Sequence, residues 1–325
     1  MAILSKIVSF LISILFAVTG IISPVLSQQV KPKDEKALRL SFATFSDTHL
    51  TDDGVARQTM LSQGFRDLDG KVDAIAVVGD LTDHGERKQF ENFYSCVKEN
   101  VKDSTFIPVV GNHDTWTKKK RNKKPTEEFI RAYNKYSGKK LKTPYYTQKV
   151  NGYTFIVMSS EKDETYAVIS SKQIKWLDKE LKKATKGGRP AFVMCHWPIN
   201  GVCGQEKIDP DMKMGKQSKA VKKVLQKYDN VFFFCGHVHA GLRGELSEKL
   251  FSHQSIETYK GVHYINLPSY MYMNTEPWES GNGGNLLSGC GYIAEVYKDK
   301  VVLRARNYAL GFYMPEYEKT IKLAK

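Results

Sequence analysis

Short apolar runs alternate with amphipathic stretches in the first third of the chain. The runs Leu38–Ser46, Asp73–Val78 and Thr105–Val110 have the length and composition of buried strands. Between them, Val55–Leu68 and Glu86–Val101 carry apolar residues at helical spacing. Strands that alternate with helices in this way favour parallel βαβ units. We therefore expect an α/β fold.

The same alternation returns after residue 150. We expect strands at Tyr153–Ser159, Ala191–Cys195 and Val231–Cys235, with helices at Ser171–Lys183 and Gln217–Tyr228 between them. The other expected elements are a helix and three strands, the last two forming a hairpin: Thr126–Tyr136, Val262–Leu267, Tyr292–Tyr297 and Val301–Asn307. Because no linker after residue 36 divides this pattern, we predict one catalytic domain spanning residues 28–325.

The first 27 residues have a different character. Lys6 is the only charged residue before Lys31, and Ile7–Ile22 is almost continuously apolar. A small residue, Ser27, then precedes Gln28, as at a signal-peptide cleavage site. We expect residues 1–27 to be a signal peptide and the protein to be secreted or held at the cell surface. The apolar run is long, so an uncleaved membrane anchor is the alternative.

Amino-acid composition adds less to the prediction than the pattern of residues does. The chain is 41% hydrophobic and 26% charged, as expected of a globular protein, and its formal net charge is +14. A basic surface attracts acidic partners, but a solvated lysine-rich surface is the simpler explanation. The run Lys118–Lys124 is expected to be such a loop, with steering of an anionic substrate as its functional alternative. None of the five cysteines forms a CxxC pair, and the sequence does not decide whether Cys203 and Cys290 form a disulfide.

Polar residues follow five of the predicted strands. They form the groups Asp47-Thr48-His49, Gly79-Asp80-Leu81-Thr82-Asp83, Gly111-Asn112-His113-Asp114, His196 and Gly236-His237-Val238-His239. Ligands of open α/β sheets bind beyond the carboxyl ends of the strands, so these groups are expected to converge on one edge.

These residue types suit hard to borderline metals. Imidazole and carboxylate ligands together favour zinc, iron or manganese. Seven candidate ligands are too many for one ion and fit two ions that share a carboxylate: Asp47, His49, Asp80, Asn112, His196, His237 and His239. We expect two divalent or trivalent metal ions, whose identity the sequence does not fix. In isolation, the aspartates could be helix caps and Asn112 a turn former.

The five groups, in this order, resemble the calcineurin-like metallophosphoesterase family over residues 40–240. The resemblance implies a four-layer αββα sandwich of two mixed sheets flanked by helices, with the metals at the carboxyl ends of the strands. It also implies hydrolysis of phosphate esters by attack of a metal-bridging hydroxide.

The resemblance assigns a role to each site residue. One metal would be held by Asp47, His49 and His239, and the other by Asn112, His196 and His237. Asp80 would bridge the two ions. His113 would assist the leaving group, with Asp83 as the carboxylate that orients its ring. Asp114 is expected to be structural.

Two departures from the motifs of known family members narrow the choice of branch within the family. Serine/threonine protein phosphatases of this family carry a phosphate-gripping arginine where this chain has His84. Purple acid phosphatases carry a metal-bound tyrosine shortly after the bridging aspartate, and Leu81, Thr82 and Asp83 fill that stretch here. The chain is therefore similar to the exported phosphodiesterases and phosphomonoesterases, acting on a small phosphorylated substrate.

Two other functions stay open. A metal-dependent nuclease on the same site would suit the basic charge, but no aromatic stacking platform is evident. A non-catalytic binding module would have lost ligands, and this chain keeps all of them. A membrane partner is expected only if residues 1–27 stay attached, and no obligate protein partner is inferred. Four aromatic residues could line a substrate pocket, although packing is the simpler interpretation: Trp197, Tyr270, Tyr272 and Trp278.

Overall fold

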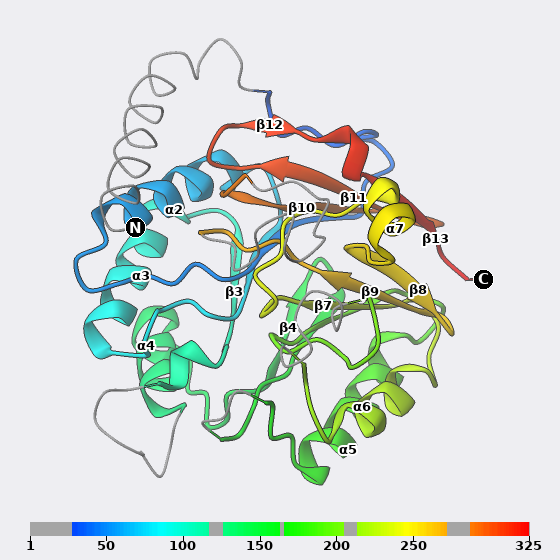
Figure 1. Cartoon of the computed structure of the whole chain (residues 1–325), viewed down its shortest axis with the longest axis horizontal. Coiled ribbons are helices and arrows are strands. Elements are labelled where there is room, and N and C mark those ends of the chain that lie inside the picture. Colours follow the sequence, from blue (N-terminus) through cyan, green and yellow to red (C-terminus); the bar gives the residue numbers. More distant parts are fainter. Residues whose placement is uncertain (1–27, 117–125, 163–165, 205–212, 272–286, 325) are drawn as a thin grey trace.

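A computed structural model describes residues 28–116, 126–162, 166–204, 213–271 and 287–324 (Figure 1). The strands are β1 Leu40–Phe45, β2 Ala74–Val78, β3 Thr105–Val109, β4 Tyr146–Val150, β5 Tyr153–Val157, β6 Ala191–Met194, β7 Val231–Cys235, β8 Ile256–Tyr259, β9 Val262–Asn266, β10 Cys290–Val296, β11 Lys300–Asn307, β12 Phe312–Tyr313 and β13 Lys319–Lys322. The α-helices are α2 Val55–Leu68, α3 Arg87–Asn100, α4 Glu127–Ser137, α5 Ser171–Ala184, α6 Ser218–Leu225 and α7 Glu245–Phe251, with short 3₁₀ turns at His113–Thr115 and Pro315–Tyr317.

The first sheet combines the two ends of the chain. Its strand order is β12-β11-β10-β1-β2-β3, and β13 also pairs with β11. β1, β2 and β3 are parallel, as expected of βαβ units, whereas β10 joins β1 in antiparallel register. β10 and β11 form the expected hairpin. The amino-terminal βαβ units are therefore completed by strands about 250 residues further along the sequence.

The second sheet has the order β4-β5-β6-β7-β9-β8. Its four central strands are parallel, and the edge strands β4 and β8 are antiparallel to their neighbours. Both sheets are therefore mixed, which confirms the expected architecture.

The two sheets pack face to face through aromatic side chains. Phe42 of β1 contacts Phe155, Phe192 and Phe234 of the second sheet, with ring centroids 4.9, 4.8 and 5.7 Å away. Because side chains alternate along a strand, Phe45 points to the opposite face of the first sheet, where it lies 6.1 Å from Phe65 of α2.

Helices cover the outer faces of both sheets. On the first sheet, α2 and α3 pack through Phe65 and Phe93, which both contact Phe106 of β3. On the second sheet, α5 and α6 bury Leu177 and Val221 in a separate apolar cluster with the outward residues of its strands. The order of layers is helix, sheet, sheet, helix (Figure 1).

Some features were not expected from the sequence. The edge strands β4 and β8 and the short helix α7 were missed, because they alternate weakly or are largely exposed. All five cysteines are free and buried, so Cys203 and Cys290 are not joined. Trp197 and Tyr270 are buried, which confirms packing for these two. Residues 1–27, expected to be a signal peptide, lie outside the described residues, as do Lys118–Lys124, Tyr272 and Trp278. Within the described residues, no helix is both long and apolar enough to cross a membrane.

Candidate metal centre

The two sheets bring the polar ends of five strands to one edge. Seven polar side chains follow these strand ends within four residues and are at most 4% exposed: Asp47, His49, Asp80, Asn112, His196, His237 and His239. The structure thus gathers every ligand that the sequence suggested into one buried region.

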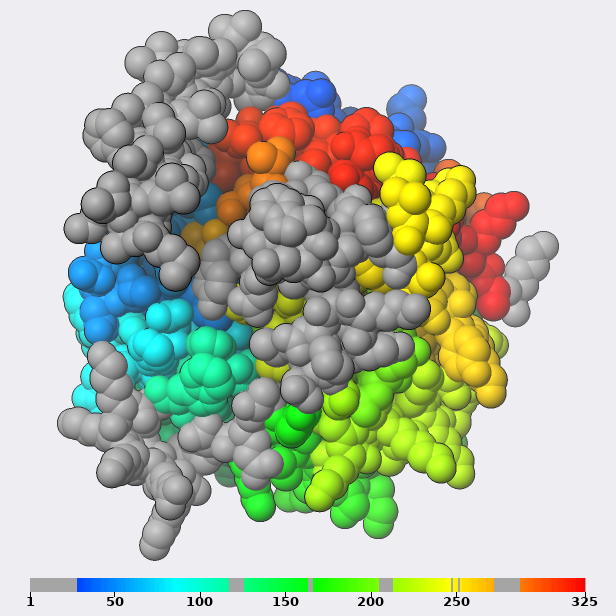
Figure 2. Space-filling model, viewed as in Figure 1, coloured from blue at the N-terminus to red at the C-terminus, as the bar shows by residue number. Residues whose placement is uncertain are grey.

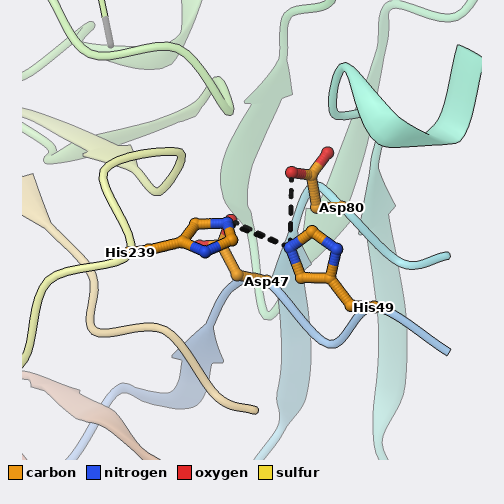
Figure 3. A group of neighbouring side chains, drawn as sticks. All are labelled: Asp47, His49, Asp80 and His239. Atoms are coloured by element: carbon orange, nitrogen blue, oxygen red, sulfur yellow. Dashed lines mark hydrogen bonds and ion pairs between the residues drawn. The ribbon is translucent and has the colours of Figure 1, made fainter. Parts of the chain in front are cut away.

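The first group lies around His49 and His239, whose Nε2 atoms are 3.0 Å apart (Figure 3). Asp47 Oδ1 is 3.2 Å from Nε2 of His239. Asp80 Oδ2 approaches from the other side, 3.6 Å from Nε2 of His49. Four ligand atoms, one from each side chain, lie within 4.8 Å of one another. A single cation could therefore contact them together.

The second group lies around His196. Its Nε2 atom is 3.2 Å from Asp80 Oδ2 and 3.2 Å from Asn112 Oδ1. His237 joins this group, because ligand atoms of Asp80, His196 and His237 also lie within 4.8 Å of one another.

Asp80 belongs to both groups. Its Oδ2 atom faces His49 on one side and His196 on the other. Its Oδ1 atom accepts a hydrogen bond of 2.9 Å from the backbone N–H of His113, which fixes the carboxylate plane. This is the arrangement that a carboxylate shared between two cations requires.

Hydrogen bonds fix the tautomers of two histidines. Nδ1 of His196 donates to the carbonyl oxygen of Val78 at 2.9 Å, because a carbonyl can only accept. Nδ1 of His49 lies 3.3 Å from Asp83 Oδ1, where the carboxylate can accept its proton. In its neutral form, each ring would then present the Nε2 lone pair to a bound metal ion, as the outer partners of metal-bound histidines arrange it.

The donor set fits metal ions. Four buried acceptor atoms have no hydrogen-bond partner in the described residues: both carboxylate oxygens of Asp47, Oδ2 of Asp80 and Nε2 of His237. Converging lone pairs repel one another, and a buried carboxylate without a partner is costly. Cations in both groups would satisfy all four atoms.

Burial and neighbouring charges shift the pKa values of several site residues. Burial favours the neutral carboxyl, but attraction by His239 lowers the pKa of Asp47. Burial is likewise outweighed at Asp80, whose pKa His196 holds well below its usual value. Burial lowers the pKa of His237 to about 3, so this imidazole is neutral. Burial opposes the charged form of His196, but Asp80 raises its pKa to about 9, so without a metal this ring is protonated. Ionised carboxylates and neutral imidazoles are the forms that bind metals, so a cation beside His196 would displace that proton.

The backbone is held in an unusual conformation at the same residues. Five of the seven have a positive φ: Asp47 (60°), His49 (43°), Asp80 (48°), His237 (72°) and His239 (52°). Side chains other than glycine adopt this left-handed region at a cost, and such residues cluster at functional sites. The turns after these strands therefore give up stability to aim the side chains inward.

Glycines in the motifs make room for ligands from other motifs. A Cβ atom on Gly79 would lie 2.3 Å from Nδ1 of His196, and one on Gly111 would lie 2.1 Å from Asp80 Oδ1. A Cβ atom on Gly236 would lie 2.7 Å from Asp47 Oδ2. Each motif thus leaves the space that a side chain of another motif fills.

The position of Asp83 differs from the sequence expectation. Its carboxylate contacts Nδ1 of His49 and Nε2 of His84, each at 3.3 Å, and Nη1 of Arg57 at 3.7 Å. His113 contacts Asp83 through the backbone instead, because its Nδ1 donates to the Asp83 carbonyl oxygen at 2.8 Å. The carboxylate turns toward these basic groups, so it orients the His49 ring rather than that of His113.

The surroundings of His113 include a residue that the sequence did not single out. Its ring meets the His49 ring edge-on at 4.5 Å and lies 3.9 Å from the indole of Trp116, which is 37% exposed. Neither Trp116 nor Arg57 belongs to a motif. Position was the only available signal, since Trp116 follows His113 by three residues and Arg57 lies in the helix after Asp47 and His49.

Asp114 has the structural role that we expected. Its carboxylate accepts hydrogen bonds from the backbone N–H groups of Leu81, Thr82 and Gly111 and from the Thr82 hydroxyl. It therefore ties the turn after β2 to the turn after β3 and fixes the distance between Asp80 and Asn112.

The calcineurin-like phosphoesterase family model matches residues 40–241, which include all seven of these side chains. The chain belongs to this family. Members of this family are phosphoesterases.

Comparison with individual proteins gives one related sequence and one similar structure. The chain is 28% identical over 174 residues to a "Probable glycerophosphodiester phosphodiesterase GpdQ" from Arcobacter nitrofigilis. That match covers 53% of this chain and 58% of the relative, so it spans little more than half of each protein. In structure, the chain is similar to a dimetal phosphatase from Danio rerio, with a TM-score of 0.60 over 88% of this chain and 100% of that one. At 15% identity, this second likeness shows the fold alone.

Proposed function

We propose that this chain is an exported metallophosphoesterase, a phosphodiesterase that holds two metal ions. Asp47, His49 and His239 would contact one ion, and Asn112, His196 and His237 would contact the other. Asp80 would contact both. The position of Asp80 Oδ2 between His49 and His196 is the observation that carries this proposal.

The residues around the ions have separate tasks. When bound, a pair of cations supplies a nucleophile from water and neutralises the charge of the phosphate. Asp80 and Asp47 set the positions of the two cations, and Asp83 holds the ring of His49. His113 donates from Nδ1 to the Asp83 carbonyl, so in the doubly protonated ring Nε2 would carry the proton that is given to the departing oxygen.

Hydrolysis of diesters rather than monoesters is supported by the named activity of the Arcobacter relative. The bond we favour as the target is a phosphodiester of the glycerophosphodiester class. The metals we favour are manganese, iron or zinc, which suit a site of imidazole, amide and carboxylate ligands.

A substrate panel tests this proposal. The purified chain, dialysed against chelator and then supplied with Mn²⁺, is assayed with bis-nitrophenyl phosphate, nitrophenyl phosphate and a glycerophosphodiester. We expect metal-dependent hydrolysis of both diesters, with kcat/KM at least about tenfold above that for the monoester. Asp80→Asn should lose turnover on all three. Faster monoester hydrolysis, or full activity of Asp80→Asn, would contradict the proposal.

Export is proposed from the amino-terminal pattern. Cleavage after Ser27 would keep the contacts of Gln28, whose N–H donates to the Gly311 carbonyl at 2.7 Å and whose Oε1 accepts from the Tyr313 N–H at 2.9 Å. Amino-terminal sequencing of the protein from the culture medium should begin at Gln28. Recovery of the intact chain from the membrane fraction would favour an uncleaved anchor instead.

A further inference from the structure

A hollow lined by lysines lies at the start of α6. Its volume is about 1010 Å³, and its lining includes Lys213, Lys216, Lys219 and Lys222 together with Asn200. The helices α5 and α6 lie side by side on the outside of the second sheet (Figure 1). Their residues form a continuous part of the surface, coloured green to yellow-green at the lower edge of Figure 2.

Hydrogen bonds tie this hollow to the edge of the sheet that carries the metal centre. The Met214 N–H donates to the carbonyl of Pro198, two residues after His196, at 2.8 Å. The Gly215 N–H donates to Asn200 Oδ1 at 3.1 Å, and the Asn200 N–H donates to Ser218 Oγ at 2.9 Å. Asn200 is four positions after His196, and four steps along the chain span at most about 14 Å. The hollow is therefore a close neighbour of the metal centre.

The lysines of the hollow lack the partners that other lysines on these helices have. Lys183 pairs with Glu180 at 2.7 Å, and Lys227 pairs with Asp178 at 2.8 Å. In the described part of the chain, no carboxylate lies within ion-pair distance of the four lysines of the hollow. Lys222 lies 5.0 Å from the ring of Tyr259, which leaves its charge in place. Four like charges around one hollow repel one another and attract anions.

We propose that the lysine hollow binds phosphates adjoining the one being hydrolysed, so that the substrate is a linear polymer of phosphodiester units. This rests on the proposed function, because it assumes phosphodiester hydrolysis at the metal centre. The lysines act as point charges, which suit phosphate without fixing its orientation. Tyr166 is the one aromatic residue among those lining the hollow, so no series of rings is present to stack on bases. The polymer is held through its backbone.

Direct binding tests this proposal without relying on turnover. Asp80→Asn protein is titrated with two fluorescein-labelled 12-unit probes, an oligothymidylate and an abasic phosphodiester oligomer of equal charge, in 0.1 M NaCl. We expect the same Kd for both within about twofold. Adding Lys216→Gln and Lys219→Gln should raise Kd about tenfold. The slope of log Kd against log salt should fall by about 1.4, at about 0.7 per lost contact with a single strand.

The matched control removes the same charge elsewhere. Lys319→Gln with Lys322→Gln changes two exposed lysines of β13, in the other sheet, and should leave Kd within about twofold. Equal weakening by both pairs, no weakening by Lys216→Gln with Lys219→Gln, or binding of oligothymidylate at least tenfold tighter than of the abasic oligomer would overturn the proposal.

A kinetic comparison separates this proposal from the function on which it rests. If native protein hydrolyses bis-nitrophenyl phosphate but Lys216→Gln with Lys219→Gln leaves KM for the 12-unit oligomer unchanged, only the lysine hollow is refuted. If no diester is hydrolysed, the proposed function fails, whereas the binding titration still decides whether the hollow holds a phosphodiester backbone.

Discussion

At the scale of single residues, the site depends on where each histidine keeps its proton. The Val78 carbonyl and the Asp83 carboxylate lie beside Nδ1 of His196 and His49, so in the neutral rings the Nε2 lone pairs would face bound cations. The motifs predicted every candidate ligand, because the residue types of the ligands and their spacing are properties of the sequence. They could not show which group Asp83 contacts, because the direction of its side chain depends on Arg57, which neighbours it only in the fold, as well as on the adjacent His84.

His113→Gln should separate substrates by their leaving groups. Proton donation matters when the departing oxygen is a poor leaving group and little when it is nitrophenolate. We expect kcat for a glycerophosphodiester to fall by about 10²–10³ and kcat for bis-nitrophenyl phosphate to fall by less than about tenfold. Bound metal, measured by elemental analysis, should not change. An equal loss on both substrates would contradict a proton-donating role.

Asp83→Asn should weaken metal binding without removing a ligand. The amide cannot supply the charged acceptor that holds Nδ1 of His49, and loss of such an outer partner typically costs 10–100-fold in metal affinity. We expect the weaker of two Mn²⁺ dissociation constants, measured by calorimetric titration, to rise in that range. Asp178→Asn, an exposed carboxylate paired with Lys227, is the control. Unchanged dissociation constants would show that His49 is oriented by other contacts.

At the scale of elements, the apolar pattern identified the buried strands and the helices between them. Each such run has an inner and an outer face, and the spacing of its apolar residues indicates whether the run is a strand or a helix. The edge strands β4 and β8 were missed because Thr147, Lys149 and Thr258 face solvent or sit at the margin of the sheet. The turns that hold the ligands were also beyond prediction, since a positive φ at His237 is set by contacts with other turns.

Gly111→Ala should damage the metal centre while leaving the fold intact. The new methyl group would lie 2.1 Å from Oδ1 and 2.3 Å from the backbone nitrogen of Asp80, so the shared carboxylate must move. We expect bound Mn²⁺ to fall by at least one ion per chain, with far-ultraviolet circular dichroism unchanged. Gly244→Ala is the control, because its nearest neighbour would lie 3.3 Å away. Full metal content in Gly111→Ala would contradict this account of the motif glycines.

At the scale of the whole molecule, the sandwich is completed by contacts that local patterns do not reveal. The pairing of Leu40 with Val296 joins residues at opposite ends of the described chain. The resemblance of the motifs predicted this architecture, whereas periodicity alone predicted only alternating strands and helices. The concentration at the start of α6 of lysines that have no carboxylate partner among the described residues appeared only once the chain was folded.

Acid should destabilise the molecule through His263 as well as through the metal centre. Burial lowers the pKa of His263 to about 4, against about 6.5 in an unfolded chain. The unfolded chain therefore binds more protons between these values, so this stabilisation is complete above pH 6.5 and is lost as the pH falls toward 4. His263 packs on Phe232 and lies 2.8 Å from the Thr258 hydroxyl.

His263→Gln keeps a polar partner for Thr258 and removes the titration. Between pH 7 and pH 4, we expect native protein to lose up to about 3 kcal/mol more unfolding free energy than the variant, at 1.36 kcal/mol per pKa unit. Urea unfolding at several pH values in chelator measures this difference. Parallel stability curves for the two proteins would contradict the assignment.

The central claim is that the buried side chains around Asp80 hold two metal ions. Elemental analysis of the purified chain after equilibrium dialysis against saturating Mn²⁺ tests it most directly, because it does not depend on the substrate. We predict two ions per chain for the native protein and at most one for Asp80→Asn. A native protein that binds no more than one ion, or an Asp80→Asn protein that still binds two, would contradict the claim.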